Sequence, residues 1–216
     1  MNLTFGQIGH MPDAGWTANG GTTPPVSSLS SNLIVLGATY DASGGAVNVS
    51  DTFGNVWIPH TEKVSLGGGS NIKARLWHAE NIIGGVPHTF TFTGLNSFIQ
   101  GFAIGISGAS STPFDAESGA GNSGATAIQP GLITPAQTDE FMITVAGFTL
   151  NTVFDLITSG FTIQFNSAGI AGQRVTGGLA LKVFSVGTEN PTWNWTGLAD
   201  GVAVMAAFKP PPVPPF

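Results

Sequence analysis

The stretch that decides the fold reads Leu33-Ile-Val-Leu-Gly-Ala-Thr-Tyr40, an almost uninterrupted apolar run. It is followed directly by Asp41-Ala-Ser-Gly-Gly45, a cluster of small and polar residues that is typical of a turn. A short apolar run that ends in turn residues predicts a strand buried in a sheet. The remainder of the chain repeats this alternation of short runs and glycine-rich turns, which is the pattern of many strands rather than of helices.

Two kinds of segment carry the other strand patterns. Apolar runs recur at 98–106, 140–148, 178–185 and 201–208, and alternation of inward and outward residues occurs at 46–50, 72–79, 89–93, 161–165 and 192–196. No stretch shows helical periodicity of useful length. Residues 51–55 form a turn signal between 46–50 and 56–59, which predicts a hairpin there. The sequence therefore predicts an all-β fold.

The strand pattern occurs twice along the chain. Phe90-Thr-Phe-Thr-Gly-Leu95 corresponds to Trp193-Asn-Trp-Thr-Gly-Leu198, and each leads into a final apolar strand. We expect half-repeats at about 28–115 and 132–209, joined by a surface loop at 107–131. The halves could be two small sandwiches, but about five strands each are few for a sandwich of typically about seven. We favour one antiparallel two-sheet β-sandwich over 28–209, jelly-roll-like, with an internal pseudo-repeat.

Both ends of the chain are expected to be extended. Residues 1–27 are rich in Gly, Pro and Thr, which predicts an arm with one strand at most. Residues 210–216 are rich in proline, which lacks the backbone donor, so we expect polyproline II rather than a strand. Such ends are either disordered or docked on a neighbouring subunit, and we favour docking.

The composition excludes several classes of function. Charged residues form 8% of the 216 residues, against about 25% in typical soluble domains, so small polar residues must cover the surface. Six Lys and Arg and a net charge of −6 leave no basic patch for a nucleic-acid backbone. No run approaches the ~18 apolar residues of a membrane span, so we expect no membrane insertion. The lack of cysteine excludes disulfides and thiol chemistry.

The first ten residues contain neither the basic nor the apolar region of a signal peptide. A charge-poor β-protein made in a cytosol without an export signal fits a virion component, which assembles there. We therefore expect a virion location, with the extracellular space or cell surface as the alternative.

Candidate catalytic and metal-binding residues are few. The histidines show no ligand spacing, so we expect satisfied or solvated side chains at His10, His60, His78 and His88. A glycosidase needs two carboxylates across a cleft. The carboxylates with suggestive spacing are Asp115, Glu117, Asp139 and Glu140, and we interpret them as turn or edge charges. We expect no catalytic residue, no cofactor and no metal, and hence no enzyme.

Asp51-Thr-Phe-Gly-Asn55 could hold Ca²⁺ through its oxygens, but it lacks the density of acids that calcium loops have. We interpret it as a turn in which Asp51 and Asn55 bond backbone amides.

Five tryptophans could stack on sugar rings if exposed, or fill a core. Trp193 and Trp195 share one face of a strand, which favours either a core layer or a subunit contact. The residues for which we expect assembly or ligand contacts are Trp16, Trp193, Trp195, Pro210, Pro211, Pro212 and Phe216.

Four segments carry a resemblance to a known group of proteins. They are Ser31-Asn-Leu-Ile-Val-Leu-Gly37, Val49-Ser-Asp-Thr-Phe-Gly-Asn-Val-Trp57, Leu76-Trp-His-Ala-Glu-Asn81 and Val204-Met-Ala-Ala-Phe-Lys-Pro210. Together they resemble a recurrent β-sandwich module of phage structural proteins and bacterial surface proteins. These are packing and turn motifs that span residues 31–210, and no catalytic residue is carried over with them.

The resemblance implies a non-enzymatic structural protein of a virus particle: a capsid decoration, fibre or tail-associated component. Its expected partners are other copies of itself and other virion proteins. The alternative is a carbohydrate-binding or adhesion module, for which the partner would be a host-surface glycan.

Overall fold

The computed structural model describes residues 4–10, 19–67, 71–94, 98–169 and 175–211. In this part of the chain there are strands and turns but no helix, and all strand pairs are antiparallel, so the fold is all-β. None of the described residues belongs to a helix long and apolar enough to cross a membrane. The strands are β1 (Thr4–His10), β2 (Gly20–Thr22), β3 (Leu33–Asp41), β4 (Asn48–Asp51), β5 (Ile58–Pro59), β6 (Lys63–Val64), β7 (Ile72–Glu80), β8 (Phe90–Thr93), β9 (Ile99–Ser107), β10 (Phe114–Ile128), β11 (Phe141–Phe148), β12 (Leu156–Ile157), β13 (Thr162–Ser167), β14 (Gly177–Val183) and β15 (Trp193–Phe208).

Each half of the chain builds its own large sheet. The first has the order β1-β9-β3-β7-β5, with β6 also paired to β7. The second has the order β10-β15-β11-β14-β13, with β12 paired to β15. The two central strands begin alike: Leu33 of β3 pairs with Ile106 and Glu80, and Phe141 of β11 pairs with residues of β15 and β14.

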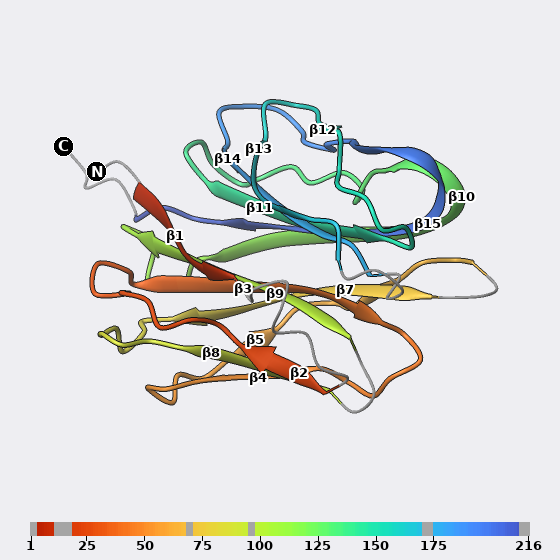
Figure 1. The fold of residues 1–216 in the computed structure, drawn as a ribbon. Coiled ribbons are helices and arrows are strands. Elements are labelled where there is room, and N and C mark those ends of the chain that lie inside the picture. The colour runs from red at the N-terminus through yellow and green to blue at the C-terminus, as the bar shows by residue number, and fades with distance from the viewer. Residues whose placement is uncertain (1–3, 11–18, 68–70, 95–97, 170–174, 212–216) are drawn as a thin grey trace.

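The two large sheets pack face to face, and they form the middle layers in Figure 1. Val35 and Leu76 of the first sheet share one apolar cluster with Ile143 and Val145 of the second. Gly37 allows a close approach, because a Cβ there would lie 2.4 Å from Val145 Cγ2.

A third sheet, of order β2-β8-β4, covers the outer face of the first large sheet and is the lowest layer in Figure 1. Phe90 and Phe92 of β8 point into a second cluster with Ile34 and Leu36 of β3. β3 is therefore buried on both faces, which explains why its sequence is a continuous apolar run rather than an alternating one.

In the second half, the outer layer is made by β10 and β15 themselves, which bend upward at the right of Figure 1. Beyond the bend, Trp193 of β15 pairs with Ile128 of β10 and Ile157 of β12. Gly124 and Gly197 have positive φ angles of 57° and 96°, which residues with side chains rarely adopt. A third cluster lies beneath this layer, on the outer face of β11.

Most predicted strands are confirmed, and three expectations are wrong. The predicted loop at 107–131 contains β10, whose small residues pair along β15 without an apolar signal. The predicted hairpin around 51–55 does not form, because β4 pairs with β8 while β5 pairs with β7. The predicted arm at 1–27 holds two strands, β1 on the edge of the first sheet and β2 beside β8.

The layering is also richer than a two-sheet sandwich, because three sheets enclose three apolar clusters. Residues 212–216 of the predicted tail lie outside the described residues.

Candidate functional site

The structure divides the seven predicted contact residues into three groups. Trp193 and Trp195 are buried, at 0% and 3% exposure, so the core layer is the alternative that the structure supports for them. Pro210 and Pro211 are half-buried beyond the end of β15. The predicted contacts that lie outside the described residues are Trp16, Pro212 and Phe216.

The two buried tryptophans have structural partners. Trp193 Nε1 donates to Thr144 Oγ1 at 3.2 Å, and Trp195 stacks on Phe148 with ring centroids 4.8 Å apart and planes 8° from parallel. Neither ring is available to a sugar or a neighbouring chain in this arrangement.

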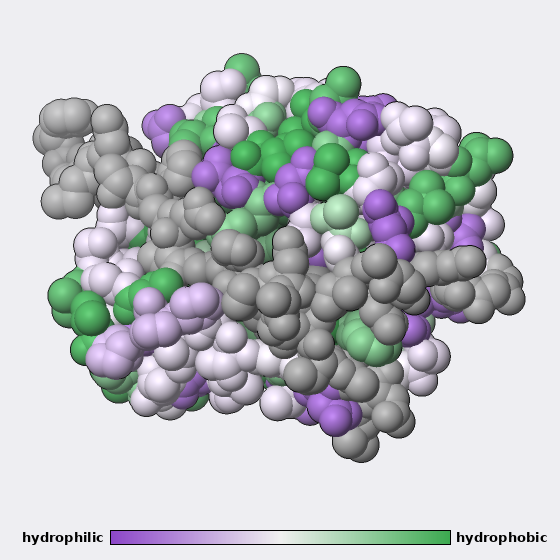
Figure 2. Space-filling view, in the orientation of Figure 1, coloured by the Kyte–Doolittle hydropathy of each residue, from purple (hydrophilic) through white to green (hydrophobic). Residues whose placement is uncertain are grey.

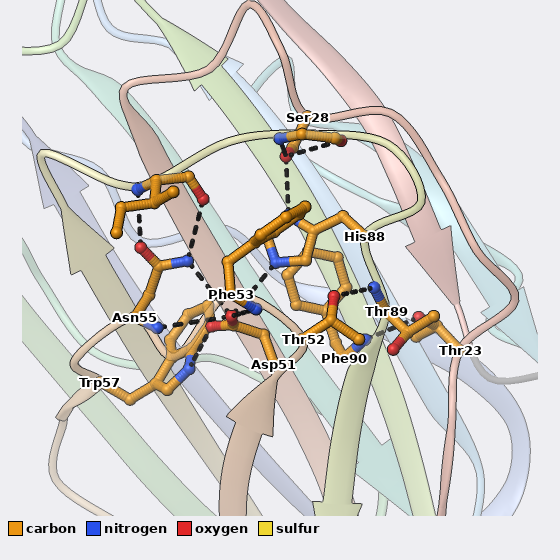
Figure 3. Close-up of polar contacts among 12 residues, drawn as sticks. Thr23, Ser28, Asp51, Thr52, Phe53, Asn55, Trp57, His88, Thr89 and Phe90 are labelled. Carbon is orange, nitrogen blue, oxygen red and sulfur yellow. Dashed lines mark hydrogen bonds and ion pairs between the residues drawn. The ribbon is translucent and has the colours of Figure 1, made fainter.

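A buried carboxylate, Asp51 at the end of β4, organises the loops of the first half (Figure 3). Its Oδ1 accepts from the amides of Phe53 at 2.7 Å and Asn55 at 3.4 Å, which confirms the predicted turn. Its Oδ2 accepts from Trp57 Nε1 at 2.9 Å. Asn55 extends the network by exchanging two bonds with the backbone of Ile83. Asp51 thus joins two loops and one aromatic ring.

His88 and Ser28 continue this network on the other side of Asp51 (Figure 3). His88 Nε2 lies 3.4 Å from Asp51 Oδ1, and His88 Nδ1 lies 2.6 Å from Ser28 Oγ. Burial lowers the pKa of His88, and the nearby Asp51 raises it in part. Ser28 also accepts from the amide of Gly85.

Asp51, His88 and Ser28 are the residue types of a nucleophilic triad, but here they have a structural role. The side chains of His88 and Asp51 are fully buried, and Ser28 is 1% exposed. A nucleophile must reach a substrate and a general base must be aimed at it. This line instead ties the loops around residues 28, 51 and 85 together.

Trp57, oriented by Asp51, lines a groove of about 180 Å³ between β4 and β7. The ring is half-buried, and its plane lies at 84° to that of Phe90, with the ring centroids 6.2 Å apart. The other lining residues are Val47, Asn48, Val49, Pro59, Arg75 and Trp77. This groove combines aromatic rings, an exposed amide and a cation.

Arg75 is fixed in this groove from two sides. Its Nε donates to the carbonyl of His60 at 2.8 Å, and its guanidinium lies 5.6 Å from the centre of the Trp77 ring. Within the described residues, no carboxylate pairs with Arg75, whereas the neighbouring Lys73 pairs with Glu62 at 2.8 Å.

A polar line also connects the two halves. Glu117 of β10 accepts from His60 Nδ1 at 2.7 Å, and His60 Nε2 lies 2.9 Å from His78 Nδ1. Burial lowers the pKa of both histidines, that of His78 to about 4, so they are neutral near pH 7. Glu117 also accepts from Thr61. A cavity of about 250 Å³ lies beside this line, and its charged or polar lining includes Lys63 and Ser118.

The carboxylates Asp115 and Glu140 come together at the base of the C-terminal tail. Glu140 is 0% exposed, and burial together with the nearby Asp115 raises its pKa to about 7. Asp115 accepts from the amide of Ala136, and Lys209 Nζ lies 3.9 Å from it. Because Glu140 is fully buried, the two are not a pair of carboxylates facing each other across a cleft.

The sequence did not identify Arg75, Asn48 or the Asp51–His88 contact as a site. Alternation placed Arg75 and Trp77 on one face of a strand, but nothing along the chain indicates that β4 lies beside that face. Within the described ranges, no group of three or more His, Asp or Glu residues could hold a metal ion.

Comparison with known proteins adds no assignment to these sites. No protein-family model matches the chain, and no curated protein matches it either.

Proposed function

We propose that this chain is a non-enzymatic structural protein of a virus particle, a decoration, fibre or tail-associated component of a phage. It acts through contacts with other copies of itself and with neighbouring virion proteins.

The observation that carries this proposal is the strand order of each half. In a jelly roll, the first, eighth, third and sixth strands form one sheet, and the second, seventh and fourth lie together in the other. The first half has β1-β9-β3-β7 in one sheet and β2-β8-β4 in the other, which matches these seven positions, whereas β5 and β6, at the place of the fifth strand, pair with β7 rather than with β4. Jelly rolls are typical of viral capsid proteins and of lectins.

The second half supports the same interpretation. If the two arms of β10 and of β15 are counted as separate strands, the order becomes first, eighth, third, sixth in the large sheet. Trp193 then lies between Ile128 and Ile157, as Phe90 lies between Thr23 and Asp51. We infer two jelly-roll-like units, related by an internal pseudo-repeat and stacked through their large sheets.

A surface patch at one end of the first half is suited to subunit contacts. It consists of four exposed aliphatic residues on three loops: Leu29, Val56, Ile83 and Val86. The loops are held rigid by bonds between Ser28 and Gly85 and between Asn55 and Ile83. Hydrophobic surface gathers at the lower left of Figure 2, where these loops turn. Exposed apolar surface that is grouped in this way is typical of interaction sites.

The test is assembly of the purified protein and its recovery in particles. We expect a stable homo-oligomer by light scattering at micromolar concentration, and the chain in purified virions by mass spectrometry. Leu29→Asp with Val56→Asp should dissociate it, whereas Leu198→Asp, which alters an equally exposed leucine of the second half, should not. A monomer that is absent from purified particles would overturn the proposal.

Carbohydrate binding is the second candidate function. It is favoured by the half-buried Trp57 in its groove, because an oriented indole face is a stacking surface for a sugar ring. The location in that case is the extracellular space or the cell surface.

A further inference from the structure

We propose that the groove between β4 and β7 is a binding site for a carboxylated sugar, with the ring against Trp57 and the carboxylate on Arg75. This proposal is independent of the particle assignment, because it is tested on the isolated protein.

The first step is the aromatic surface. A side chain that must stack on a flat ligand loses less entropy on binding when it is already immobilised. Trp57 is fixed at its polar end by Asp51 Oδ2, and its ring packs at 84° to the ring of Phe90. Asp51 is itself held by two backbone amides, so the indole is set by the loop and not only by its own rotamer.

The second step is the cation. A half-buried charge is normally paired, since partial desolvation without a partner is unfavourable. Among the described residues, no carboxylate forms an ion pair with Arg75, although Arg75 is close enough to Glu62 to help lower the pKa of that carboxyl, and the only hydrogen bond of Arg75 to them uses Nε. Both terminal amino groups therefore remain for another acceptor. A guanidinium fork matches a carboxylate in a bidentate geometry, which selects an acidic ligand over a neutral one.

The third step is a comparison with the equivalent place in the second half. In the pairing register, Arg75 lies opposite Ala38 of β3, and its counterpart Gly178 lies opposite Ala146 of β11. A Cβ on Gly178 would lie 2.7 Å from Phe154 Cδ2, so the Phe154 ring fills the space above it. The space above this strand position is thus filled by Phe154 in the second half, whereas in the first half the corresponding space is the groove.

These steps define the ligand. The groove of about 180 Å³ admits one ring rather than an extended chain, and Asn48 at its rim offers an exposed amide to hydroxyl groups. The shared chemistry is a pyranose with a carboxylate, which occurs both in sialic acids and in uronic acids.

Calorimetric titration of the full chain with sialyllactose, a glucuronate-terminated disaccharide and neutral lactose tests the proposal. We expect at least one acidic sugar to bind at least about tenfold more tightly than lactose, since one charge-assisted bidentate contact separates them. Whichever acidic sugar binds more tightly identifies the source. Equal affinity for lactose and both acids, or no binding of either acid at millimolar concentration, overturns the proposal.

Variants then assign the residues. Arg75→Gln should remove the preference for the acidic sugar, and Trp57→Ala should weaken binding of all three. Lys63→Gln, which removes another cation of the same half that lines a different cavity, should leave affinity unchanged. Each variant is first shown to unfold cooperatively in urea. If Arg75→Gln folds and keeps the wild-type preference, the assignment of the carboxylate to Arg75 is wrong.

Discussion

The outer layers of the two halves of the molecule are filled by opposite chemistry. In the outer layer of the first half Asp51 pairs with Phe90, and in that of the second half Ile157 pairs with Trp193. Asp51 is surrounded by hydrogen-bond donors, whereas Ile157 packs against an aromatic cluster. An outer layer can therefore be filled by a hydrogen-bonded polar network or by apolar side chains.

A second difference concerns continuity. In the first half, β8 and β9 are separate strands, while in the second β15 runs through both layers as one. The first half is consequently tied together by loops that meet at Asp51, and the second by strands that bend at glycines. We expect the first half to be sensitive to changes of charge and the second to changes of volume.

The largest effect is expected from Trp193→Ala in the second half. It removes a fully buried indole and leaves a cavity between β15 and β11, which should lower the free energy of unfolding by about 3–5 kcal/mol. Trp57→Ala removes a half-buried indole of the first half and should lower it by at most about 2 kcal/mol. Urea denaturation measures both values. Equal losses would show that the first half also depends on aromatic volume.

Asp51→Ala tests the polar half. It leaves the partly buried donors Trp57 Nε1 and the Phe53 amide without their acceptor, so we expect a loss of about 2–4 kcal/mol. Ile157→Ala removes only part of a half-buried side chain and should lower stability by about 1–2 kcal/mol. Both are measured by urea denaturation, and indole fluorescence should shift in Asp51→Ala because Trp57 is released. A smaller loss for Asp51→Ala than for Ile157→Ala would contradict the role given to the carboxylate.

Two sets of buried groups should also respond differently to pH. Burial depresses the pKa values of His60, His78 and His88, so the unfolded chain binds more protons and stability falls as pH drops below about 6.5. The pKa shift of Glu140, in the second half, has the opposite effect on stability. Because its folded pKa is raised to about 7, its contribution is full below about pH 4.5 and is lost as pH rises through 7.

Glu140→Gln isolates the second effect. The amide cannot ionise, and it supplies a permanent donor next to Asp115. We expect the variant to exceed the wild type by about 3 kcal/mol at pH 8 and to match it near pH 4.5. Denaturation at several pH values measures the difference, from which the histidine effects cancel. A difference that does not change with pH would show that Glu140 is ionised in the folded protein.

The strands were predictable where burial on both faces requires a continuous apolar sequence. β3, β9 and β11 are covered on both faces, so their sequences are continuous apolar runs that locate them closely. β10 could not be predicted in this way, because it is an edge strand of Gly, Ala and Ser that gains its place from backbone pairing with β15. Its small residues are what a loop also contains.

The groove was less predictable than the strands. Trp57 and Arg75 lie in segments that the sequence pattern predicts as strands. Their proximity to β4 in the groove arises because β4 belongs to the small sheet and not to the first large sheet. The sequence predicts a hairpin at that point, since Asp51 to Asn55 has turn residues in any case. β4 and β5 are separated because β4 forms its backbone hydrogen bonds with β8 and β5 forms its own with β7. The residues of the turn do not determine these partners.

The smallest effect is expected at the bend that makes the second half continuous. Gly124 has a φ angle of 57°, its amide donates to Asp200 Oδ1 at 3.0 Å, and a Cβ there would meet nothing within 4 Å. Alanine should therefore lower stability by about 1 kcal/mol through backbone conformation alone. Asparagine tolerates this region better, so Gly124→Asn should lower stability less than Gly124→Ala even though it is larger. Urea denaturation of both variants measures the difference. A greater loss of stability for Gly124→Asn than for Gly124→Ala would mean that the space at the bend is limiting, so that β10 depends on packing as the rest of the second half does.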